Sequence, residues 1–371
     1  MTAPIRVGIV GVHAERGWAA TAHIPALLAL PGYAITALST TRQASADAAG
    51  QAFGVGLTFE GHDRLVHSPE VDLVVVTVKV PHHREIVSAA LNAGKSVYSE
   101  WPLGRDFDDA LAMAALAEAR GARTLVGLQS RRAPALLHLR DLIADGYVGS
   151  VLSTTMVGSS MLGGVVDQAN EYTLDRVNAA NMVTIAAGHS MDILTEVLGG
   201  FTELSALTDT RRPDVVVHET GEHRIKTSPD QLGVLGHLAS GATASIHFRE
   251  GHTGGVGFLW EINGTEGTLQ VRADGGHPGM FALSLFGSRG HAVLGEIQVP
   301  ALASECDAVL EGLNPLSAGV ARMYDAFARD VREATRTAPD FGQALPIHRL
   351  IDTINRAAST GQRTMMTPAA A

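Results

Sequence analysis

The chain is poor in several residue types that would define a class of protein. It has one cysteine, Cys306, which excludes an internal disulfide framework and a cysteine-based zinc site and fits a reducing compartment. Residues 1–4 lack the charged and apolar regions of a secretory signal, and no apolar run reaches 18 residues. We therefore expect a cytoplasmic protein that makes no contact with a membrane.

Positive charge is also scarce. The sequence has 28 Lys and Arg against 38 Asp and Glu, which gives a formal net charge of -10, and the basic residues are scattered. Such a surface repels a phosphate backbone, so we expect no direct partner among nucleic acids. Hydrophobic residues make up 46% of the 371 residues, a composition and length that favour two compact domains.

The first 130 residues alternate short β-branched segments with helical patterns, as in a parallel sheet wound with helices. The expected strands are 5–10, 34–39, 71–78, 96–99 and 124–128, and the expected helices are 24–30, 84–93 and 106–119. The run VDLVVVTV at 71–78 is typical of a strand buried on both faces. We expect residues 1–130 to form a doubly wound α/β domain of the Rossmann type.

Beyond residue 130 the strands follow one another more closely. The expected helices are 134–144, 318–333 and 342–359, and the expected strands are 151–157, 232–238, 242–248, 257–263 and 268–271. The stretch LGVLGHLASGATASIHF is typical of a β-hairpin. We expect residues 131–371 to form an α+β domain with a large, mostly antiparallel, open sheet.

The first strand ends in a turn that resembles a dinucleotide-binding motif. The pattern G-x-G-x-x-G lets backbone amides approach a pyrophosphate at a helix N-terminus. Only the first position matches, because a histidine occupies the second and the last glycine comes one residue late. Such a turn also occurs in proteins that bind no nucleotide; if one binds here, we expect contacts from Gly11, Val12, His13, Gly17 and Trp18.

The end of the second strand indicates which dinucleotide would bind. NAD-binding proteins place an acidic residue there for the ribose hydroxyls, whereas this chain reads Ser39-Thr40-Thr41-Arg42. Hydroxyls and a guanidinium suit a 2′-phosphate, so we expect NADP as the cofactor, with NAD as the alternative. Arg42 could instead simply solvate the start of a helix.

The chain resembles the Gfo/Idh/MocA oxidoreductases over nearly its whole length. The resemblance rests on the ordered blocks VGIVG, VDLVVVTVKVPHHREIV, GKSVYSEWPLG, LQSRRAP, GYVG and GHSMDIL, and on the closing DFGQALPIHRLIDTINRAASTGQR. It implies an N-terminal domain that binds NAD or NADP, and a second domain whose sheet carries the substrate and often mediates oligomerisation. We therefore expect a homodimer or higher homo-oligomer.

Two family motifs are altered. Members usually read E-K-P where this chain has Glu100-Trp101-Pro102, and D-x-x-x-H where it has Ile185 four residues before His189. The Trp is shared with the branch typified by the fungal galactose-regulon repressor, which binds NADP and acts as a sensor that holds a transcriptional activator. The resemblance also places a set of further residues at the cofactor: Val78, His83, Glu100, Trp101 and Arg131.

The substitutions bear on hydride transfer, which needs a proton acceptor and usually a cation near the reacting oxygen. Trp101 cannot carry a charge or relay a proton. The resemblance makes His189 the acid/base, although a buried histidine bonded to a backbone carbonyl would have the same pattern. Asp192, three residues on, could orient its ring, and Lys79 at the end of the fourth strand could replace the lost ammonium.

Other polar residues offer less specific signals. Adjacent histidines at 82 and 83 point in different directions and lack a nearby carboxylate set, so we expect no metal site. Arg131 and Arg132 could hold a substrate oxygen or a cofactor phosphate, or they could be solvated hinge charges. A polar loop before His189 could touch a sugar-like ligand through Glu171, Tyr172, Asp175 and Arg176.

Three functions remain open. The first is an NADP-dependent oxidoreductase acting on a sugar, polyol or related carbonyl compound. The second is a catalytically silent, NADP-bound sensor that binds a protein partner, and the third is a non-classical enzyme of internal redox chemistry. The lost Lys and Asp leave open whether the chain is an enzyme, and we favour the first function.

Overall fold

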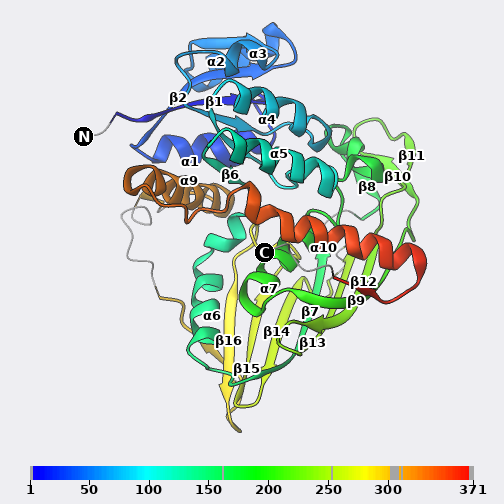
Figure 1. Ribbon diagram of the computed structural model, residues 1–371. Coiled ribbons are helices and arrows are strands. Elements are labelled where there is room, and N and C mark those ends of the chain that lie inside the picture. The colour runs from blue at the N-terminus through cyan, green and yellow to red at the C-terminus, as the bar shows by residue number, and fades with distance from the viewer. Residues whose placement is uncertain (1–2, 161–162, 252–253, 301–308, 311, 367–371) are drawn as a thin grey trace. The chain divides into compact units, whose positions relative to one another are not determined.

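The computed structural model describes residues 3–160, 163–251, 254–300, 309–310 and 312–366, which belong to two compact units (Figure 1). The first comprises residues 1–129 and 302–345, and the second comprises residues 130–301 and 346–371. This division differs from the expected one in that residues 302–345 group with the first unit. Cys306 lies outside the described residues.

A six-stranded parallel sheet forms the centre of the first unit, with the strand order β3-β2-β1-β4-β5-β6. Its strands are β1 (Ile5–Val10), β2 (Tyr33–Thr40), β3 (Leu57–Glu60), β4 (Leu73–Val76), β5 (Ser96–Ser99) and β6 (Thr124–Val126). The order confirms the doubly wound α/β fold. β4 and β6 are shorter than expected, and β3 has no counterpart among the expected strands.

The central strand β4 shows why this sheet forms. All four of its side chains, in the sequence LVVV, are fully buried, because the sheet is covered on both faces. One face packs on a cluster that joins Val7, Ile9 and Val75 to Val320 and Tyr324. The Val-rich run at 73–76 therefore contributes to a core and cannot serve as an exposed edge.

Helices and short helical turns connect the strands of the first unit. They are η1 (Ala19–His23), α1 (Ile24–Ala29), α2 (Gln43–Phe53), α3 (Asp63–Val66), η2 (Val80–His82), α4 (His83–Asn92) and α5 (Phe107–Ala119). Asp106 starts α5 by accepting a hydrogen bond from the amide of Asp109 at 2.7 Å. Gly54, with φ of 69°, ends α2.

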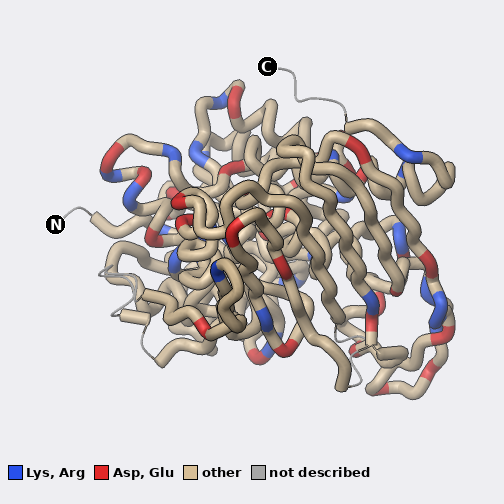
Figure 2. The backbone as a smooth tube through the Cα atoms, turned by 90° about the horizontal axis from the view of Figure 1, so that it is seen from below, with Lys and Arg blue, Asp and Glu red and all other residues tan. Residues whose placement is uncertain are grey.

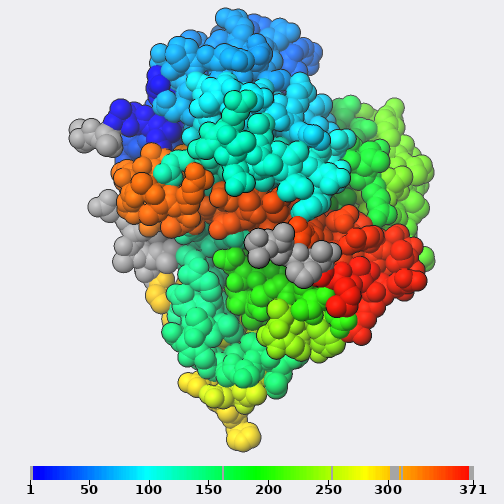
Figure 3. Space-filling model, viewed as in Figure 1, coloured from blue at the N-terminus to red at the C-terminus, as the bar shows by residue number. Residues whose placement is uncertain are grey.

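Helix α9 (Pro315–Glu333) belongs to the first unit although it lies about 200 residues beyond β6 in the sequence. Asn314 caps its start by accepting from the amide of Ser317 at 2.9 Å. Its buried side chains pack against α1 and η1, and its surface lies directly against residues of the N-terminal segment (Figure 3). The helix thus covers one face of the parallel sheet.

The second unit is built on a nine-stranded sheet with the order β17-β16-β15-β14-β7-β13-β12-β9-β18. Its strands are β7 (Val151–Ser160), β9 (Phe201–Asp209), β12 (Gln231–Leu238), β13 (Thr243–Glu250), β14 (Phe258–Gly264), β15 (Gly267–Ala273), β16 (Ser284–Arg289), β17 (Gly295–Ile297) and β18 (Thr364–Met365). Only the β7/β13 pair is parallel, which confirms the large, mostly antiparallel sheet.

β12 and β13 form the expected hairpin, with Leu232 opposite Phe248. Alternate side chains along both strands are buried, so one face of the sheet is packed and the other is open. The packed face carries Trp260, whose indole N–H donates to the Thr154 hydroxyl at 2.8 Å.

Helical segments and a smaller sheet complete the second unit. They are η3 (Gln129–Arg132), α6 (Pro134–Ala144), η4 (Gln168–Leu174), η5 (Arg176–Asn178), α7 (Ala186–Leu198), α10 (Phe341–Thr360), β8 (Val165–Val166), β10 (Asp214–Val217) and β11 (His223–Ile225). η3 and α10 each cross a division between the units. The small sheet, with the order β11-β10-β8, has a core of its own around Val166, Leu174, Val215 and Val217.

Positive and negative residues are interspersed along the backbone of each unit (Figure 2). None of the helices in the described ranges is long and apolar enough to cross a membrane.

Candidate functional site

The carboxyl ends of β1 and β4 lie side by side at the point where the strand order of the first sheet reverses. The amide of Gly11 donates to the Ser39 carbonyl at 2.9 Å, and the amide of Thr77 donates to the Val10 carbonyl at 3.0 Å. Open α/β sheets bind ligands at this point. The turn at Gly11 and the segment after β4 therefore form one edge of a candidate nucleotide site.

Gly11 cannot be replaced at this edge without strain. Its φ is +102°, and a Cβ built on it would lie 2.8 Å from Cγ1 of Val78. The chain needs glycine here so that its backbone can run close to the end of β4. Gly17, with φ of +89°, has open space around it and serves the turn into the helix.

The other residues of the turn differ in their surroundings. Val12 is buried in the core, whereas His13 is exposed and its Nδ1 accepts from the amide of Glu15 at 3.1 Å. Trp18 is half-buried, and its indole N–H is buried with no acceptor in the described part of the chain. That N–H could satisfy an acceptor atom of a bound group.

At the end of β2, the hydroxyls expected at a phosphate are already engaged or buried. Thr40 Oγ1 donates to the Arg42 carbonyl at 2.9 Å, and Ser39 is fully buried. Thr41 and Arg42 are exposed, and the Arg42 guanidinium has no hydrogen-bonding or ion-pair partner among the described residues. Of the four, Thr41 and Arg42 are therefore placed to meet a ligand phosphate.

This edge fits a dinucleotide. The close backbone approach at Gly11, the unsatisfied N–H of Trp18 and the uncommitted cation of Arg42 are the features that a pyrophosphate and a ribose phosphate need. A bound nicotinamide would supply or accept a hydride, and the residues of the first unit would hold its phosphate and ribose groups.

Glu100 lies at the end of β5 in a buried hydrogen-bonded chain. His23 is fully buried; its Nε2 is 2.8 Å from Glu100 Oε1, and its Nδ1 is 2.7 Å from the hydroxyl of Tyr324 on α9. A Cβ on Gly127 would lie 2.6 Å from Glu100 Oε2. His23 thus binds the carboxylate and Gly127 leaves room for it, which orients the segment that continues to Trp101.

Trp101 and Lys79 follow neighbouring strands of the parallel sheet. Trp101 precedes Pro102 through a cis peptide bond, and its side chain is only 6% exposed. Lys79 is exposed, three residues beyond the end of β4, at the same edge as Gly11. The indole is thus part of the first unit's packing, whereas the ammonium is accessible.

His83, expected at the cofactor, has a different environment. It is buried at the start of α4, with Nε2 2.9 Å from the Val78 carbonyl and Nδ1 3.0 Å from the Pro102 carbonyl. Burial lowers the pKa of His83. Because both ring nitrogens face backbone oxygens, we assign His83 to joining the segments after β4 and β5.

In the second unit, His189 lies in the first turn of α7, beside His277 from the loop after β15. The ring centroids are 4.2 Å apart, and both rings are buried. Burial lowers the pKa of His189 well below its usual value, and the neighbouring His277 lowers it further. Burial also lowers the pKa of His277 to about 4, so both rings are neutral at pH 7.

Asp192, expected to orient His189, has both carboxylate oxygens bound by Arg131. Nε and Nη2 of Arg131 donate to them at 2.8 and 2.6 Å, and Nη1 lies 3.1 Å from Glu196. The pair is buried, and burial raises the pKa of Asp192 although Arg131 opposes this shift. We therefore assign Asp192 to anchoring Arg131, the residue expected at the cofactor, on α7.

A cavity of about 190 Å³ lies beside His277 in the second unit. Most of the wall that a ligand would touch is apolar. Ile185, which stands where the family has Asp, is part of that wall. The lining residues are Ser159, Ser160, Thr173, Leu174, Ala180, Asn181, Met182, Ile185, Ala186, Lys226, Ser228, Glu250, Gly276, His277, Met280 and Phe281.

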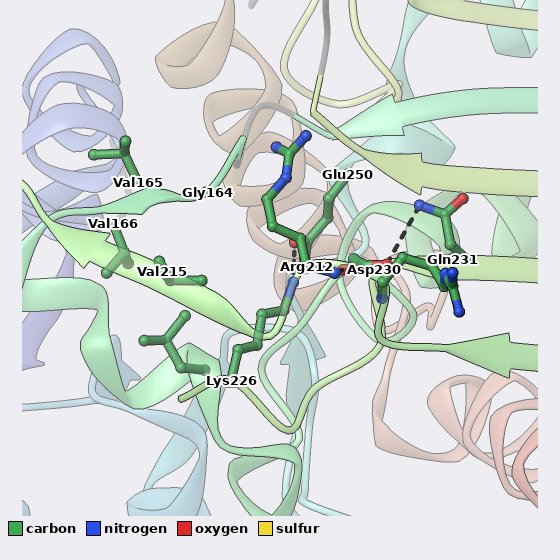
Figure 4. Close-up of a pocket in the computed structure, with 11 residues that line it drawn as sticks. Gly164, Val165, Val166, Arg212, Val215, Lys226, Asp230, Gln231 and Glu250 are labelled. Carbon is green, nitrogen blue, oxygen red and sulfur yellow. Dashed lines mark hydrogen bonds and ion pairs between the residues drawn. The ribbon is translucent and has the colours of Figure 1, made fainter. Parts of the chain in front are cut away.

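A buried ion pair borders this cavity. Lys226 Nζ donates to Glu250, and both side chains are more than nine-tenths buried. The same pair lines a second cavity of about 130 Å³, whose wall also includes Arg212, Asp230 and residues of the small sheet (Figure 4). Burial raises the pKa of Glu250, and the ammonium of Lys226 opposes the shift.

The polar loop before α7 contributes less than expected. Glu171 accepts from Arg224 Nε at 3.1 Å, Asp175 caps η5 through the amide of Val177, and Arg176 donates to Asn355 at 3.1 Å. Burial raises the pKa of Tyr172. These four residues stabilise the loop, and their neighbours Thr173 and Leu174 line the cavity instead.

The cavity residues His277, Asn181, Lys226 and Glu250 are absent from the sequence-based expectations. His277 stands in the turn-rich stretch DGGHPGM, which has no periodicity that would mark a site. Among the described residues, no three His, Cys, Asp or Glu side chains are grouped so as to hold a metal ion.

Two family models match the chain, each over one part of it. Residues 5–128 match the oxidoreductase family with an NAD-binding Rossmann fold, and residues 134–273 match the C-terminal domain of Gal80p. The two matches cover the first unit's sheet and most of the second unit's sheet.

Known proteins are similar over nearly the whole length. Dehydrogenase aclE of Aspergillus oryzae is 31% identical over 380 residues, covering 98% of this chain and 99% of that protein. The galactose/lactose metabolism regulatory protein GAL80 of Saccharomyces cerevisiae is 29% identical over 305 residues, covering 76% and 70%. A crystal structure of a Gal80p super-repressor mutant from Saccharomyces cerevisiae superimposes with a TM-score of 0.87, at 26% identity and 98% coverage of both chains. Further relatives include sugar dehydrogenases and reductases.

Proposed function

This chain belongs to the Gfo/Idh/MocA oxidoreductase family, and from that premise we propose that it is an NADP-dependent oxidoreductase acting on a sugar, polyol or related carbonyl compound. Its first unit is an NAD(P)-binding Rossmann domain. The relatives are in part sugar dehydrogenases and reductases, which supports the substrate class.

The observation that carries the proposal is the buried, neutral imidazole of His189 next to a cavity-lining residue of the same unit. A neutral ring can take the hydroxyl proton from an alcohol while a hydride leaves the carbon. In the reverse direction the protonated ring returns that proton to the carbonyl oxygen. Because Trp101 replaces the lysine of the family's E-K-P motif, Lys79 is the candidate cation at the edge of the sheet.

Selection of NADP rests on Arg42. Its guanidinium is exposed at the end of β2, and no acidic residue occupies positions 39–42. A carboxylate there would repel a 2′-phosphate, whereas a guanidinium donates charge-assisted hydrogen bonds to it.

A regulatory protein is the second candidate function, and Ile185 and Trp101 favour it. Both are apolar residues that stand where the family has ionisable ones; Trp101 is buried and Ile185 is partly buried. The similarity to GAL80, a galactose/lactose metabolism regulatory protein, supports a regulator, and such a regulator would be a catalytically silent sensor.

The discriminating experiment follows NADPH absorbance with a panel of ketoses, aldoses, inososes and a deoxygenated ring ketone, 2-methylcyclohexanone. His189→Ala is expected to lower turnover by at least about 100-fold while NADP still binds. His291→Ala, at an exposed position of the same unit, is the matched control and should leave turnover unchanged. If NADP binds but no compound gives His189-dependent turnover, the oxidoreductase proposal is wrong and the regulator is favoured.

We also propose a homodimer through the open face of the nine-stranded sheet. Leu207 of β9 and Leu235 of β12 point to this face, and they are 67% and 57% exposed. Apolar side chains at such positions are typical of an interface. Leu235→Glu should shift the mass measured by light scattering toward the monomer; an unchanged mass would contradict this interface.

A further inference from the structure

The lining of the cavity beside His277 restricts the chemistry of its ligand. Its side chains of Leu174, Met182, Ile185, Met280 and Phe281 offer no hydrogen bonds. A cavity of about 150 Å³ with such a lining holds one benzene ring, so the volume here, about 190 Å³, suits a single six-membered ring with a small substituent.

Most polar groups of the lining are already satisfied. The hydroxyl of Thr173 donates to the Asn170 carbonyl at 2.7 Å, and that of Ser228 donates to the Thr173 carbonyl at 2.9 Å. Lys226 and Glu250 bind each other. The two hydroxyl protons and the ion pair are thus engaged inside the protein, and little polar surface of the lining faces the cavity.

Three lining groups remain without such a partner in the described part of the chain: His277 Nε2, Asn181 Nδ2 and Ser160 Oγ. A fully hydroxylated ring carries a polar group on every carbon. Most of its hydroxyls would therefore lose their water without gaining a hydrogen bond in this cavity.

The loop that carries His277 is held firmly. The amide of Gly276 donates to the Ser159 carbonyl of β7 at 2.8 Å, and a Cβ on Gly276 would lie 2.6 Å from the Ser159 amide nitrogen. His277 Nδ1 accepts from the amide of Gly279 at 3.2 Å. In the neutral ring the proton is therefore on Nε2, which makes that atom a hydrogen-bond donor.

Resting on the proposed function, we infer that the substrate is a largely deoxygenated ring, an alicyclic or aromatic alcohol or ketone, whose oxygen accepts a hydrogen bond from His277 Nε2. The ring occupies the apolar cavity, and His277 acts as a binding residue. Within the proposed substrate class, this inference favours the related carbonyl compounds and their alcohols over fully hydroxylated sugars and polyols.

The first test compares two six-membered ring ketones with the NADPH-loaded protein: 2-methylcyclohexanone and an inosose. We expect kcat/KM to be at least about 100-fold higher for the deoxygenated ring, because the inosose would bury several unsatisfied hydroxyls. Binding of each ketone to the NADP-loaded protein is measured in parallel by calorimetry, so that binding is known even without turnover.

Variants of His277 test the hydrogen bond. His277→Phe keeps the ring but removes the donor and is expected to raise KM for 2-methylcyclohexanone about tenfold, as is typical of one lost hydrogen bond. His277→Gln keeps an N–H donor and should restore most of the affinity. His291→Phe, at an exposed position outside the strands of the same unit, is the matched control.

The outcomes separate this inference from the proposed function. Preferential reduction of the inosose would overturn the inference and leave the oxidoreductase intact. His277-dependent binding of 2-methylcyclohexanone without turnover of either ketone would support the cavity's ligand class and contradict the oxidoreductase. Failure of both rings to bind, or equal behaviour of the Phe and Gln variants, would overturn the inference.

Discussion

The first unit keeps the charged groups of its candidate site accessible to water, whereas the second unit buries charged groups around its cavity. Arg42 and Lys79 are exposed at the edge of the parallel sheet, and the ion pair of Arg6 with Asp72 is partly solvated. In the second unit, Arg131 binds Asp192 and Lys226 binds Glu250, and none of these four side chains is more than 12% exposed.

Under the proposed function, the difference follows from what each unit would bind. A dinucleotide carries charged phosphates and remains partly solvated when bound. Its site therefore needs exposed cations and a backbone that can approach the phosphates closely. A carbon that exchanges a hydride needs a dry environment in which neutral histidines and fixed dipoles act on it. The ion pair that lines the cavity, Lys226 with Glu250, holds its segments in place with its opposite charges facing each other.

Of the changes that test this comparison, breaking the buried Lys226–Glu250 pair should have the largest effect. Lys226→Met leaves the Glu250 carboxylate buried without a counter-ion, and it is expected to lower the free energy of unfolding by about 3–5 kcal/mol. Chemical denaturation measures the loss. The double variant Lys226→Met/Glu250→Leu should recover most of it, and a double variant as unstable as the single one would contradict this explanation.

The two units should also differ in the pH dependence of their carboxylates. Burial raises the folded-state pKa of Glu250 above the ordinary value of 4.5. Below pH 4.5 the carboxyl is protonated in both states, and its burial then carries no cost of a charge. As pH rises toward the raised pKa, this cost grows and lowers the stability of the folded state. Glu250→Gln should therefore be relatively more stable at neutral than at acidic pH, when compared with the parent. The opposite trend would show that Lys226 outweighs burial.

The pKa of Asp330 in the first unit is shifted in the opposite direction from that of Glu250. Burial alone would raise its pKa, but hydrogen bonds from Thr335, Ala338 and Thr337 outweigh it and hold the pKa below the usual value. Asp330→Asn should lower the free energy of unfolding by about 1–3 kcal/mol at pH 7. The difference should shrink as pH falls through the folded-state pKa, below about 4, and a constant difference in acid would contradict it.

A variant of Arg42 tests whether the edge of the first sheet binds a phosphate group. Arg42→Ala should raise the Kd for NADP about tenfold and leave the Kd for NAD unchanged, because only NADP has the 2′-phosphate. Fluorescence titration with both nucleotides measures this. Arg120→Ala, at an exposed position at the end of α5, is the control, and equal losses for both nucleotides would contradict the assignment.

The smallest effect on stability is expected for the partly solvated pair of Arg6 and Asp72. Arg6→Met removes the ion pair with Asp72, whose side chain is 45% exposed, and should leave the denaturation midpoint almost unchanged. A loss comparable to that of Lys226→Met would remove the contrast between the two units.

Much of the fold could be predicted because its signals are local. The Val run of β4 and the β12/β13 hairpin each depend on residues close in sequence. The periodicity of α9 predicts a helix with an apolar face, but it does not tell which sheet that face covers. Its packing on α1 depends on contacts between segments nearly 300 residues apart.

The candidate site was less predictable. Spacing identified Gly11, and the family motif identified His189. Asp192 was expected beside His189 because of helical spacing, yet Arg131, 61 residues earlier, binds it. His277 comes from a turn without periodicity, so its approach to His189 depends on the path of the sheet.

The sequence by itself determined the two sheet types, the glycine at the sheet edge and the loss of the ionisable family residues at 101 and 185. These properties follow from backbone preferences and residue chemistry that act over a few positions. Only the tertiary structure decided which carboxylate meets which cation, which histidine joins His189, and how apolar the cavity is. Such pairings require segments distant in the chain to pack together, and their free energy depends on burial that no short stretch encodes.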